Sequence, residues 1–327
     1  DKADKNWTKI KTLWNQGNDE QTLNSVKATE SLDQYANWIM NAASVEELNS
    51  VMLELFNIGC DVPITMEACP DLNNSDFMVC WVDRGGLGLP DRDYYFKPEM
   101  ETKREKYKEF LATLTEYISN TYGCSNKFGR PDTFAETAEK IYELEKSLAA
   151  AQMTMTDRRD PQKIFNPMTY SELLIKYPNI NWTQVIKYVN IDIHNHKICI
   201  QEPEYMQKLN DLLSSVDMRT WNNYLLGRLV TSFFPFLDDE INQIGFDFYG
   251  TVLSGQNEQK PRWKRVMRSV EGKVGELIGK KYCSMYFTEE SKKSVLDMVS
   301  NMINTFKKRI MNLEWMSNST KQRAILK

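Results

Sequence analysis

The sequence contains two histidines, His194 and His196, and they limit the chemistry that the chain can perform. On a β-strand, residues two apart share a face, so both imidazole rings can point at one metal ion. A third ligand would have to come from Asp192 or from elsewhere in the chain. A zinc site with three histidine ligands is excluded, and a Ser-His-Asp mechanism would have to use one of these two residues. The alternative is a pair of surface histidines on a β-hairpin that bind no metal.

A glycine-rich segment at residues 85–90 reads Gly-Gly-Leu-Gly-Leu-Pro and follows a predicted strand, the usual context of a phosphate-binding loop. No Gly-Lys-Ser/Thr triplet follows it, and Pro90 and Asp91 stand where a helix would begin to bind phosphate. We therefore interpret the segment as a tight backbone turn that needs a positive φ angle or very close packing.

A basic segment at residues 260–273 includes Trp263, a combination that is typical of nucleic-acid interfaces. The basic residues surround an apolar helical stripe, which favours a solvated or ion-paired helix face instead. The whole chain has 41 Lys and Arg against 45 Asp and Glu, a net charge of -4. We therefore expect no nucleic-acid partner.

Acidic and cysteine residues offer two further kinds of site. Glu143 and Glu145, near the charged run 157–160, provide a candidate acid pair, but nothing in the sequence fixes their separation, so glycosidase chemistry is not predicted. The six cysteines are widely spaced and form no Cys-x-x-Cys pair, which argues against a zinc ribbon. Their even number permits disulfides, and scattered buried thiols are the alternative.

The ends of the chain and its modification motifs suggest where it works. No apolar run approaches the length of a membrane-spanning helix. The chain opens without a basic-then-apolar leader and stops inside a helical pattern, so we expect a mature or trimmed piece of a longer protein. The sequons at Asn6, Asn73, Asn181 and Asn318 matter only if the protein is secreted by a eukaryotic cell.

Helical periodicity dominates the 327 residues. Capping boxes are expected at Ser44–Glu47 and Thr169–Glu172, and proline starts at Pro203 and Pro261. Further helices are predicted over 98–122, 132–151 and 218–235 and after Thr288. Strands are predicted at 76–83 and around 191–200. The predicted fold is mainly α: one large multi-helix lobe over residues 1–327, with one or two short β-hairpins or a small sheet and no internal boundary.

Several segments together resemble one known family. Residues 86–95, Gly-Leu-Gly-Leu-Pro-Asp-Arg-Asp-Tyr-Tyr, are similar to the signature of the neprilysin-type zinc metallopeptidases. Five more stretches agree with that family in order and spacing. They are 157–161 with 166–169, the Pro-Glu-Tyr at 203–205, Arg228, 248–250 with 261–265, and 313–316 with Thr320 and Lys321.

The resemblance implies a zinc metalloendopeptidase that cleaves short peptides with a metal-activated water. The His-Glu-x-x-His motif of the family is absent from the chain, so the zinc ligands are expected beyond residue 327, and none in this chain. The chain then corresponds to the helical lobe that faces the catalytic lobe and restricts entry to it. The family also implies an extracytoplasmic location. A stand-alone helical interaction module without catalysis is the alternative.

The resemblance assigns structural rather than catalytic roles to the matching residues. Turn formation is expected of the segment that includes Gly86, Leu87, Gly88, Leu89 and Pro90, and Arg92 and Asp93 are candidates for a fixed polar network. Packing is expected of Tyr94, Tyr95, Trp263 and Trp315. Pro203 and Tyr205 belong to the Pro-Glu-Tyr motif. Arg228 and Arg262 are expected either to pair inside the lobe or to face the chamber. The family's disulfide-forming cysteines near the tyrosine pair have no match, because Phe96 follows the tyrosines.

Overall fold

The computed structural model describes residues 5–25, 28–123, 132–190 and 197–327. These residues form two compact units. Unit 1 combines helix α1 (Lys5–Asn18) with Pro261–Lys327, and unit 2 comprises Asp19–Lys260. Each unit is described by itself, and the expectation of one continuous lobe stays a prediction.

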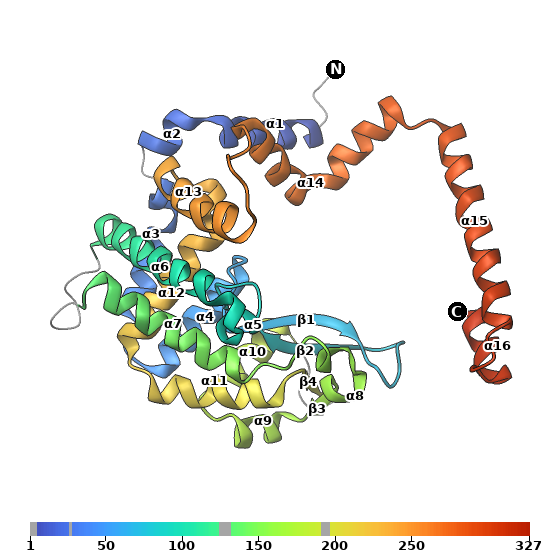
Figure 1. Cartoon of the computed structure of the whole chain (residues 1–327), viewed down its shortest axis with the longest axis horizontal. Helices are drawn as coiled ribbons and strands as arrows, with labels where there is room; N and C mark the ends of the chain where they lie inside the picture. The colour runs from blue at the N-terminus through green and yellow to red at the C-terminus, as the bar shows by residue number, and fades with distance from the viewer. Residues whose placement is uncertain (1–4, 26–27, 124–131, 191–196) are drawn as a thin grey trace. The chain divides into compact units, whose positions relative to one another are not determined.

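Unit 2 is a body of helices with a small sheet at its edge (Figure 1). Its α-helices are α2 (Glu20–Ser25), α3 (Asp33–Asn41), α4 (Val45–Asn57), α5 (Asp93–Phe96), α6 (Glu101–Tyr122), α7 (Phe134–Ala150), α8 (Pro161–Ile164), α9 (Tyr170–Lys176), α10 (Trp182–Val189), α11 (Pro203–Ser215), α12 (Met218–Phe233) and α13 (Asp239–Gly245). Short 3-10 turns occupy η1 (Ala28–Leu32), η2 (Pro98–Met100), η4 (Asp157–Arg159) and η5 (Phe234–Phe236), and η6 (Phe246–Leu253) is a π-helix. The predicted mainly α fold is confirmed.

Local signals set most of the helix ends. Thr169 caps α9 in a full capping box with Glu172, and Thr133 does the same for α7 with Glu136. Ser44 caps α4 by accepting from the backbone N–H of Glu47. Gly123 ends α6 in the left-handed region at φ 65°, where glycine carries no steric penalty.

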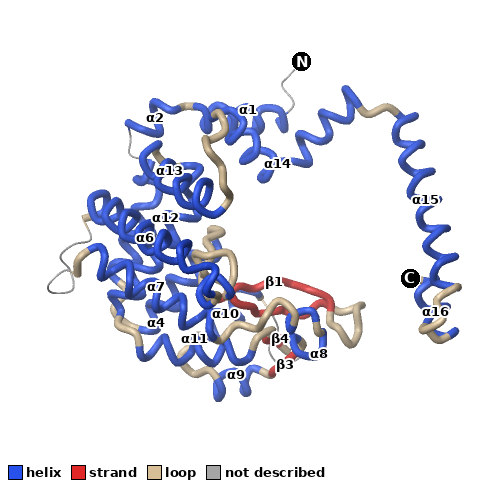
Figure 2. Tube along the Cα trace, in the orientation of Figure 1, coloured by secondary structure: helices blue, strands red, loops and turns tan. Residues whose placement is uncertain are grey.

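The sheet has four strands in the order β1-β2-β4-β3 and appears in red in Figure 2. Strand β1 (Ile64–Pro70) pairs antiparallel with β2 (Met78–Arg84), and β2 runs parallel to β4 (Ile198–Ile200). Strand β3 (Asn166–Met168) is antiparallel to β4. The strand predicted at 76–83 is confirmed, whereas β1 and β3 were not predicted. Of the strand expected around the histidines, 198–200 is present and 191–196 lie outside the described residues.

The core of unit 2 lies between α6, α7, α11 and α12 and is rich in aromatic side chains. Phe110 of α6 stacks on Phe248 with ring centroids 4.9 Å apart. The stripe that periodicity predicts on α6 is buried, because its members Tyr107, Leu111 and Leu114 face this core. Helix α12 is buried on most sides, as its sequence indicates.

Unit 1 contains α1, α14 (Arg262–Tyr286), α15 (Glu289–Met311) and α16 (Asn318–Leu326). Helix α14 is kinked at Val274, whose φ and ψ of -135° and 32° are not helical. Its Val266 and Val270 pack against Ile10 of α1 and form a small separate core. No helix among the described residues is long and apolar enough to cross a lipid bilayer.

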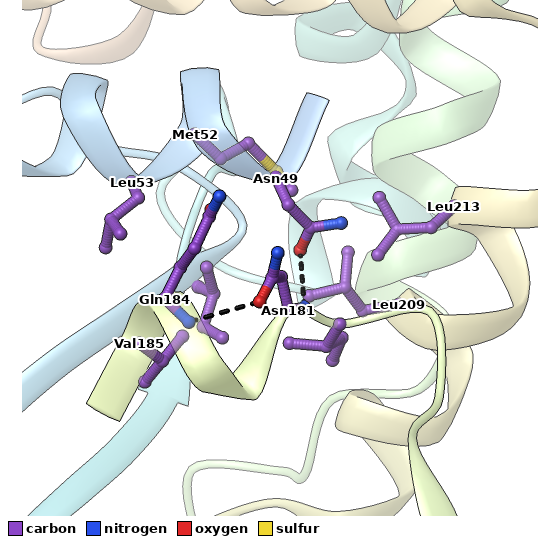
Figure 3. Close-up of a pocket in the computed structure, with 10 residues that line it drawn as sticks. Asn49, Met52, Leu53, Asn181, Gln184, Val185, Leu209 and Leu213 are labelled. Atoms are coloured by element: carbon purple, nitrogen blue, oxygen red, sulfur yellow. Dashed lines mark hydrogen bonds between the residues drawn. The ribbon is translucent and has the colours of Figure 1, made fainter. Parts of the chain in front are cut away.

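A buried asparagine joins α4 to the start of α10 (Figure 3). The side chain of Asn49 donates to the carbonyl of Asn179 at 2.9 Å and accepts from the backbone N–H of Asn181 at 3.0 Å. These groups border a small apolar cavity of about 10 Å³. The asparagine therefore satisfies two partly buried backbone groups.

We predict that Asn49→Ala lowers the free energy of unfolding of unit 2 by about 1–3 kcal/mol, because two partly buried backbone groups lose their partners. Urea unfolding followed by circular dichroism measures the change. Asn57→Ala is the matched control: it removes an exposed hydrogen bond from the same helix and should cost about 0.5 kcal/mol or less. Equal effects of the two substitutions would contradict the role of Asn49.

Candidate functional site

The glycine loop, residues 85–90, lies directly after β2 and is packed too tightly for larger side chains. Gly86 has φ +78°, and a Cβ on it would lie 2.2 Å from the hydroxyl of Tyr224. A Cβ on Gly88 would lie 1.7 Å from the hydroxyl of Tyr107. The loop therefore needs glycine both for its backbone angle and for close approach, which confirms its interpretation as a tight turn.

The backbone N–H groups of the glycine loop point into the protein. Gly86 donates to the Asp61 carboxylate at 2.7 Å, and Leu89 donates to the hydroxyl of Tyr95 at 3.2 Å. Gly85 donates to the Pro63 carbonyl at 3.3 Å. A phosphate-binding loop needs such groups free to face a ligand, so the engagement of these three argues against that role.

Tyrosines from three other elements hold the loop carbonyls. Tyr224 of α12 donates to the carbonyl of Gly86 at 2.6 Å, and Tyr249 of η6 donates to that of Gly88 at 3.3 Å. Tyr205, in the first turn of α11 after Pro203, donates to the carbonyls of Pro63 and Gly85 at 2.7 and 3.1 Å. Hydrogen bonds therefore hold the loop both through its backbone N–H groups and through its backbone carbonyls.

The centre of this tyrosine network is the carboxylate of Glu145, on α7. Its side chain is buried and accepts hydrogen bonds from Tyr95 at 2.7 Å and from Tyr107 at 2.8 Å. Burial raises the pKa of Glu145, while nearby Arg228, the two tyrosines and the backbone N–H of Gly88 act in the opposite direction. Burial likewise raises the pKa of Tyr95 and Tyr107 well above the usual range, and the adjacent Glu145 adds to the effect.

Arg228 lies beside this network and pairs with Asp61. Its Nε donates to the Asp61 carbonyl at 2.9 Å, and one of its terminal nitrogens contacts the Asp61 carboxylate. Burial favours the neutral form of Arg228, but Asp61, Tyr224, Tyr249 and Glu145 together outweigh burial, and the net pKa is raised. Of the two positions expected for this residue, pairing inside the fold is therefore present.

A groove of about 470 Å³ opens beside the glycine loop. The glycine loop supplies some of the lining residues. The others come from Asp61, from α12 and from the segment that follows α12. The lining residues are Asp61, Leu87, Gly88, Leu89, Pro90, Arg228, Thr231, Ser232, Phe234, Tyr249 and Leu253. The groove is mostly apolar, with Asp61 as its partly exposed charge.

The candidate acid pair, Glu143 and Glu145, does not form. Glu143 is exposed and pairs with Lys146 at 3.0 Å, whereas Glu145 faces the core. Positions two apart on a helix point in different directions, so the two carboxylates cannot share a substrate.

A second charged cluster fixes the sheet to the segment that carries η4. Arg158 contacts Asp83 and Glu202, both at 2.6 Å, and Arg84 contacts Glu202 at 3.2 Å. Glu202 also accepts from the backbone N–H of Met153 at 2.6 Å. Asp61, Asp83 and Glu202 were not identified from the sequence, because each is a lone acid whose partner is far along the chain.

The remaining motif residues lie outside these networks. Arg92 lies 5.9 Å from the ring centroid of Phe96, and Asp93 pairs with Lys97 at 2.8 Å on the surface. Tyr94 is partly buried against the core.

In unit 1, Arg262 donates to the carbonyl of Gly17 at 2.9 Å. Trp263 and Trp315 are 53% and 75% exposed, so their role as packing residues stays a prediction.

No metal site forms within the four described stretches, since no three His, Cys, Asp or Glu side chains gather there. Five cysteines in these stretches are free thiols: Cys60, Cys69, Cys80, Cys199 and Cys283. Burial raises the pKa of Cys60, Cys80 and Cys199 to about 11, which disfavours the thiolate that binds metal or attacks substrate. His194 and His196 lie outside the described residues.

We predict that Gly88→Ala destabilises unit 2 by about 1–3 kcal/mol, because the new methyl group displaces Tyr107 from its contact with Glu145. Thermal and urea unfolding measure the loss. The control is Gly227→Ala in α12, where the nearest atom to a new Cβ is 3.7 Å away. There we expect no loss, or a gain of up to about 1 kcal/mol from helix propensity.

The titration of Glu145 should make the free energy of unfolding depend on pH. Its pKa in the folded state lies above the ordinary value of 4.5, so the folded protein holds this proton more tightly than the unfolded chain. The contribution of Glu145 is complete below pH 4.5 and is lost as pH rises through the folded-state pKa. The difference in unfolding free energy between the natural chain and Glu145→Gln should therefore shrink from pH 4.5 towards neutrality.

Urea unfolding at a series of pH values measures this difference. Glu143→Gln removes an exposed carboxylate from the same helix and reports the effect of the substitution alone. A Glu145→Gln difference that is constant or grows with pH would show that the folded-state pKa is not raised.

Comparisons with known proteins agree with this architecture. A model of the amino-terminal part of Peptidase family M13 matches residues 1–327. Endothelin-converting enzyme 1 of Bos taurus is 28% identical over 258 residues, which cover 78% of this chain and 33% of that protein. The zinc metalloprotease Zmp1 of Mycobacterium tuberculosis, solved with an inhibitor, superposes with a TM-score of 0.84 at 25% identity over 96% of this chain and 46% of its own.

PepO of Lactobacillus rhamnosis shares the fold, with a TM-score of 0.79 at 18% identity, over 97% of this chain and 49% of its own. The chain thus spans about a third of the length of the curated relatives and less than half of the solved structures. It belongs to Peptidase family M13, a family of zinc metallopeptidases, and corresponds to their amino-terminal region.

Proposed function

We propose that this chain is the substrate-restricting lobe of a zinc metalloendopeptidase that cleaves short peptides. The proposal rests on one observation: the whole chain matches the model of the amino-terminal part of the family. The chain spans only about a third of the length of its curated relatives. The zinc ligands and the group that activates water then belong to a catalytic lobe supplied by sequence outside this chain. The described residues of this chain contribute no ligand set for zinc.

The rigid glycine loop supports a role in shaping access rather than in bond cleavage. A wall that excludes large substrates and bulk water needs a fixed backbone, and the tyrosine network fixes this one on all sides. The groove beside the loop carries mostly apolar side chains, and its Asp61 carboxylate is already paired with Arg228. Its chemistry suits contact with a peptide better than attack on one.

An exposed apolar face on α15 supports the proposal that a second lobe packs against this chain. Leu296, Val299 and Ile303 recur at helical spacing and are 56%, 44% and 49% exposed, and Phe306 is 65% exposed. A continuous face of this kind marks a surface that another body covers. The catalytic lobe is the partner that we assign to it.

The family also supports an extracytoplasmic location, either secreted, periplasmic or as the ectodomain of a tethered protein. We further propose that residues 260–273 serve unit 1 rather than nucleic acid. Two apolar residues of that segment, Val266 and Val270, are buried against Ile10.

The central test uses the full-length protein and the isolated chain side by side. We expect the full-length protein to hydrolyse short fluorogenic peptides, to lose activity with a chelator and to regain it with zinc. The isolated chain should hydrolyse none of them and retain no stoichiometric zinc after dialysis. A full-length protein that lacks zinc and peptidase activity would instead support the stand-alone interaction module, and tight zinc in the isolated chain would overturn the assignment of the ligands.

The docking face gives a sharper test in the same full-length protein. Phe306→Asp places a charge in the apolar stripe and should lower peptide hydrolysis at least tenfold, which corresponds to about 1.4 kcal/mol. Asn301→Asp is the matched control, because it adds the same side chain to the same helix on the side away from the stripe. Equal activity of the two variants would rule out the proposed contact.

A further inference from the structure

The sequons at Asn6, Asn73, Asn181 and Asn318 lie in very different surroundings. Asn6 belongs to α1 and Asn318 to α16, both in unit 1, while Asn73 and Asn181 belong to unit 2. A glycan is bulky and polar, so it is compatible only with an asparagine whose side chain points into solvent.

Asn181 makes hydrogen bonds that stabilise the fold. Its side chain caps α10 by accepting from the backbone N–H of Gln184 at 3.1 Å, and its backbone N–H donates to Asn49. Figure 3 shows Asn181 between Asn49 and Gln184, at a cavity of about 10 Å³. The capping bond holds the half-buried Asn181 side chain against α10, which disfavours a sugar on it.

Asn73 lies in the turn that connects β1 to β2, and Figure 2 shows this turn at an edge of unit 2. The turn is held by its backbone, since Asp71 donates to the Phe77 carbonyl at 2.9 Å. The backbone N–H of Asn73 donates to the Asp71 carboxylate at 2.7 Å. Asn73 and Ser75, the two residues that define the sequon, are both exposed.

The turn also carries exposed apolar side chains. Leu72, Phe77 and Met78 are 50%, 62% and 57% exposed. Strand β1 is in addition an edge strand of the sheet, whose outer side has no pairing strand among the described residues. Exposed apolar groups at the end of an edge hairpin favour association between chains unless something covers them.

We propose that Asn73 carries an N-linked glycan that covers the apolar end of the β1–β2 hairpin, and that Asn181 carries none. In the transfer, the amide nitrogen of Asn73 forms a bond to the anomeric carbon of a lipid-linked oligosaccharide diphosphate. The bond from that carbon to the phosphate oxygen breaks, the lipid diphosphate leaves with the electron pair, and the amide gives up one proton. The inference rests on the extracytoplasmic location in the proposed function, with secretion through a eukaryotic cell.

The test is the full-length protein secreted from cultured eukaryotic cells. Release of N-glycans by an amidase converts each modified asparagine to aspartate, and peptide mass spectrometry then reports every sequon. We expect conversion at Asn73 and none at Asn181. Asn73→Gln and Ser75→Ala should each remove one glycan from the intact mass, whereas Asn74→Gln keeps the sequon and should keep the glycan.

An unmodified Asn73 overturns the proposal, whether Asn318 in the same molecules is modified or not, and would indicate that another part of the protein covers the hairpin. A glycan on Asn181 overturns the assignment of this capping residue as unmodified. Zinc-dependent peptide hydrolysis by the same preparation separates the two proposals: activity with an unmodified Asn73 refutes only the glycan, and a modified Asn73 without activity refutes only the peptidase.

Discussion

The buried carboxylate of Glu145 is the constraint on which the arrangement of unit 2 depends. A carboxyl group in a core is costly unless its oxygens are hydrogen-bonded, and Tyr95 and Tyr107 supply those bonds from α5 and α6. Gly88 approaches the same group so closely that any side chain would displace Tyr107. One helix, α7, thereby fixes the positions of two others and of the glycine loop.

This constraint explains why the most recognisable motif of the chain carries no reacting group. The loop N–H groups donate to Asp61, Tyr95 and Pro63, and the loop carbonyls accept from tyrosine hydroxyls. These N–H groups, and that of Gly88 beside Glu145, are engaged within the protein and do not face an anion or a developing charge. What the network produces is a rigid surface beside an open groove, which suits a lobe that shapes access to a catalytic centre.

Two amphipathic helices show how the same pattern leads to different surroundings. The stripe on α6 includes Tyr107, Phe110 and Leu111, and all three are buried in unit 2. The stripe on α15 has the same spacing, yet Leu296 and Phe306 are exposed. Periodicity reports only that one face avoids water, because it depends on the helix alone. The burial of that face depends on a second body, which for α15 we assign to the catalytic lobe.

The sequence by itself determined the helices and the family. The Thr169 capping box, the Pro203 start and the Gly123 stop act within one turn of chain, so they can be read without the fold. The mainly α class follows from them. The family motifs lie in short contiguous segments and are equally visible in the sequence.

Only the tertiary structure decided which polar groups meet. Asp61 and Arg228 are 167 residues apart, and Tyr107 and Glu145 are 38 apart. Strand β1 was missed for the same reason: its Glu67, Ala68 and Pro70 have low strand propensity, and pairing with β2 stabilises it. Contacts between distant segments depend on how whole elements pack, and no local pattern encodes that packing.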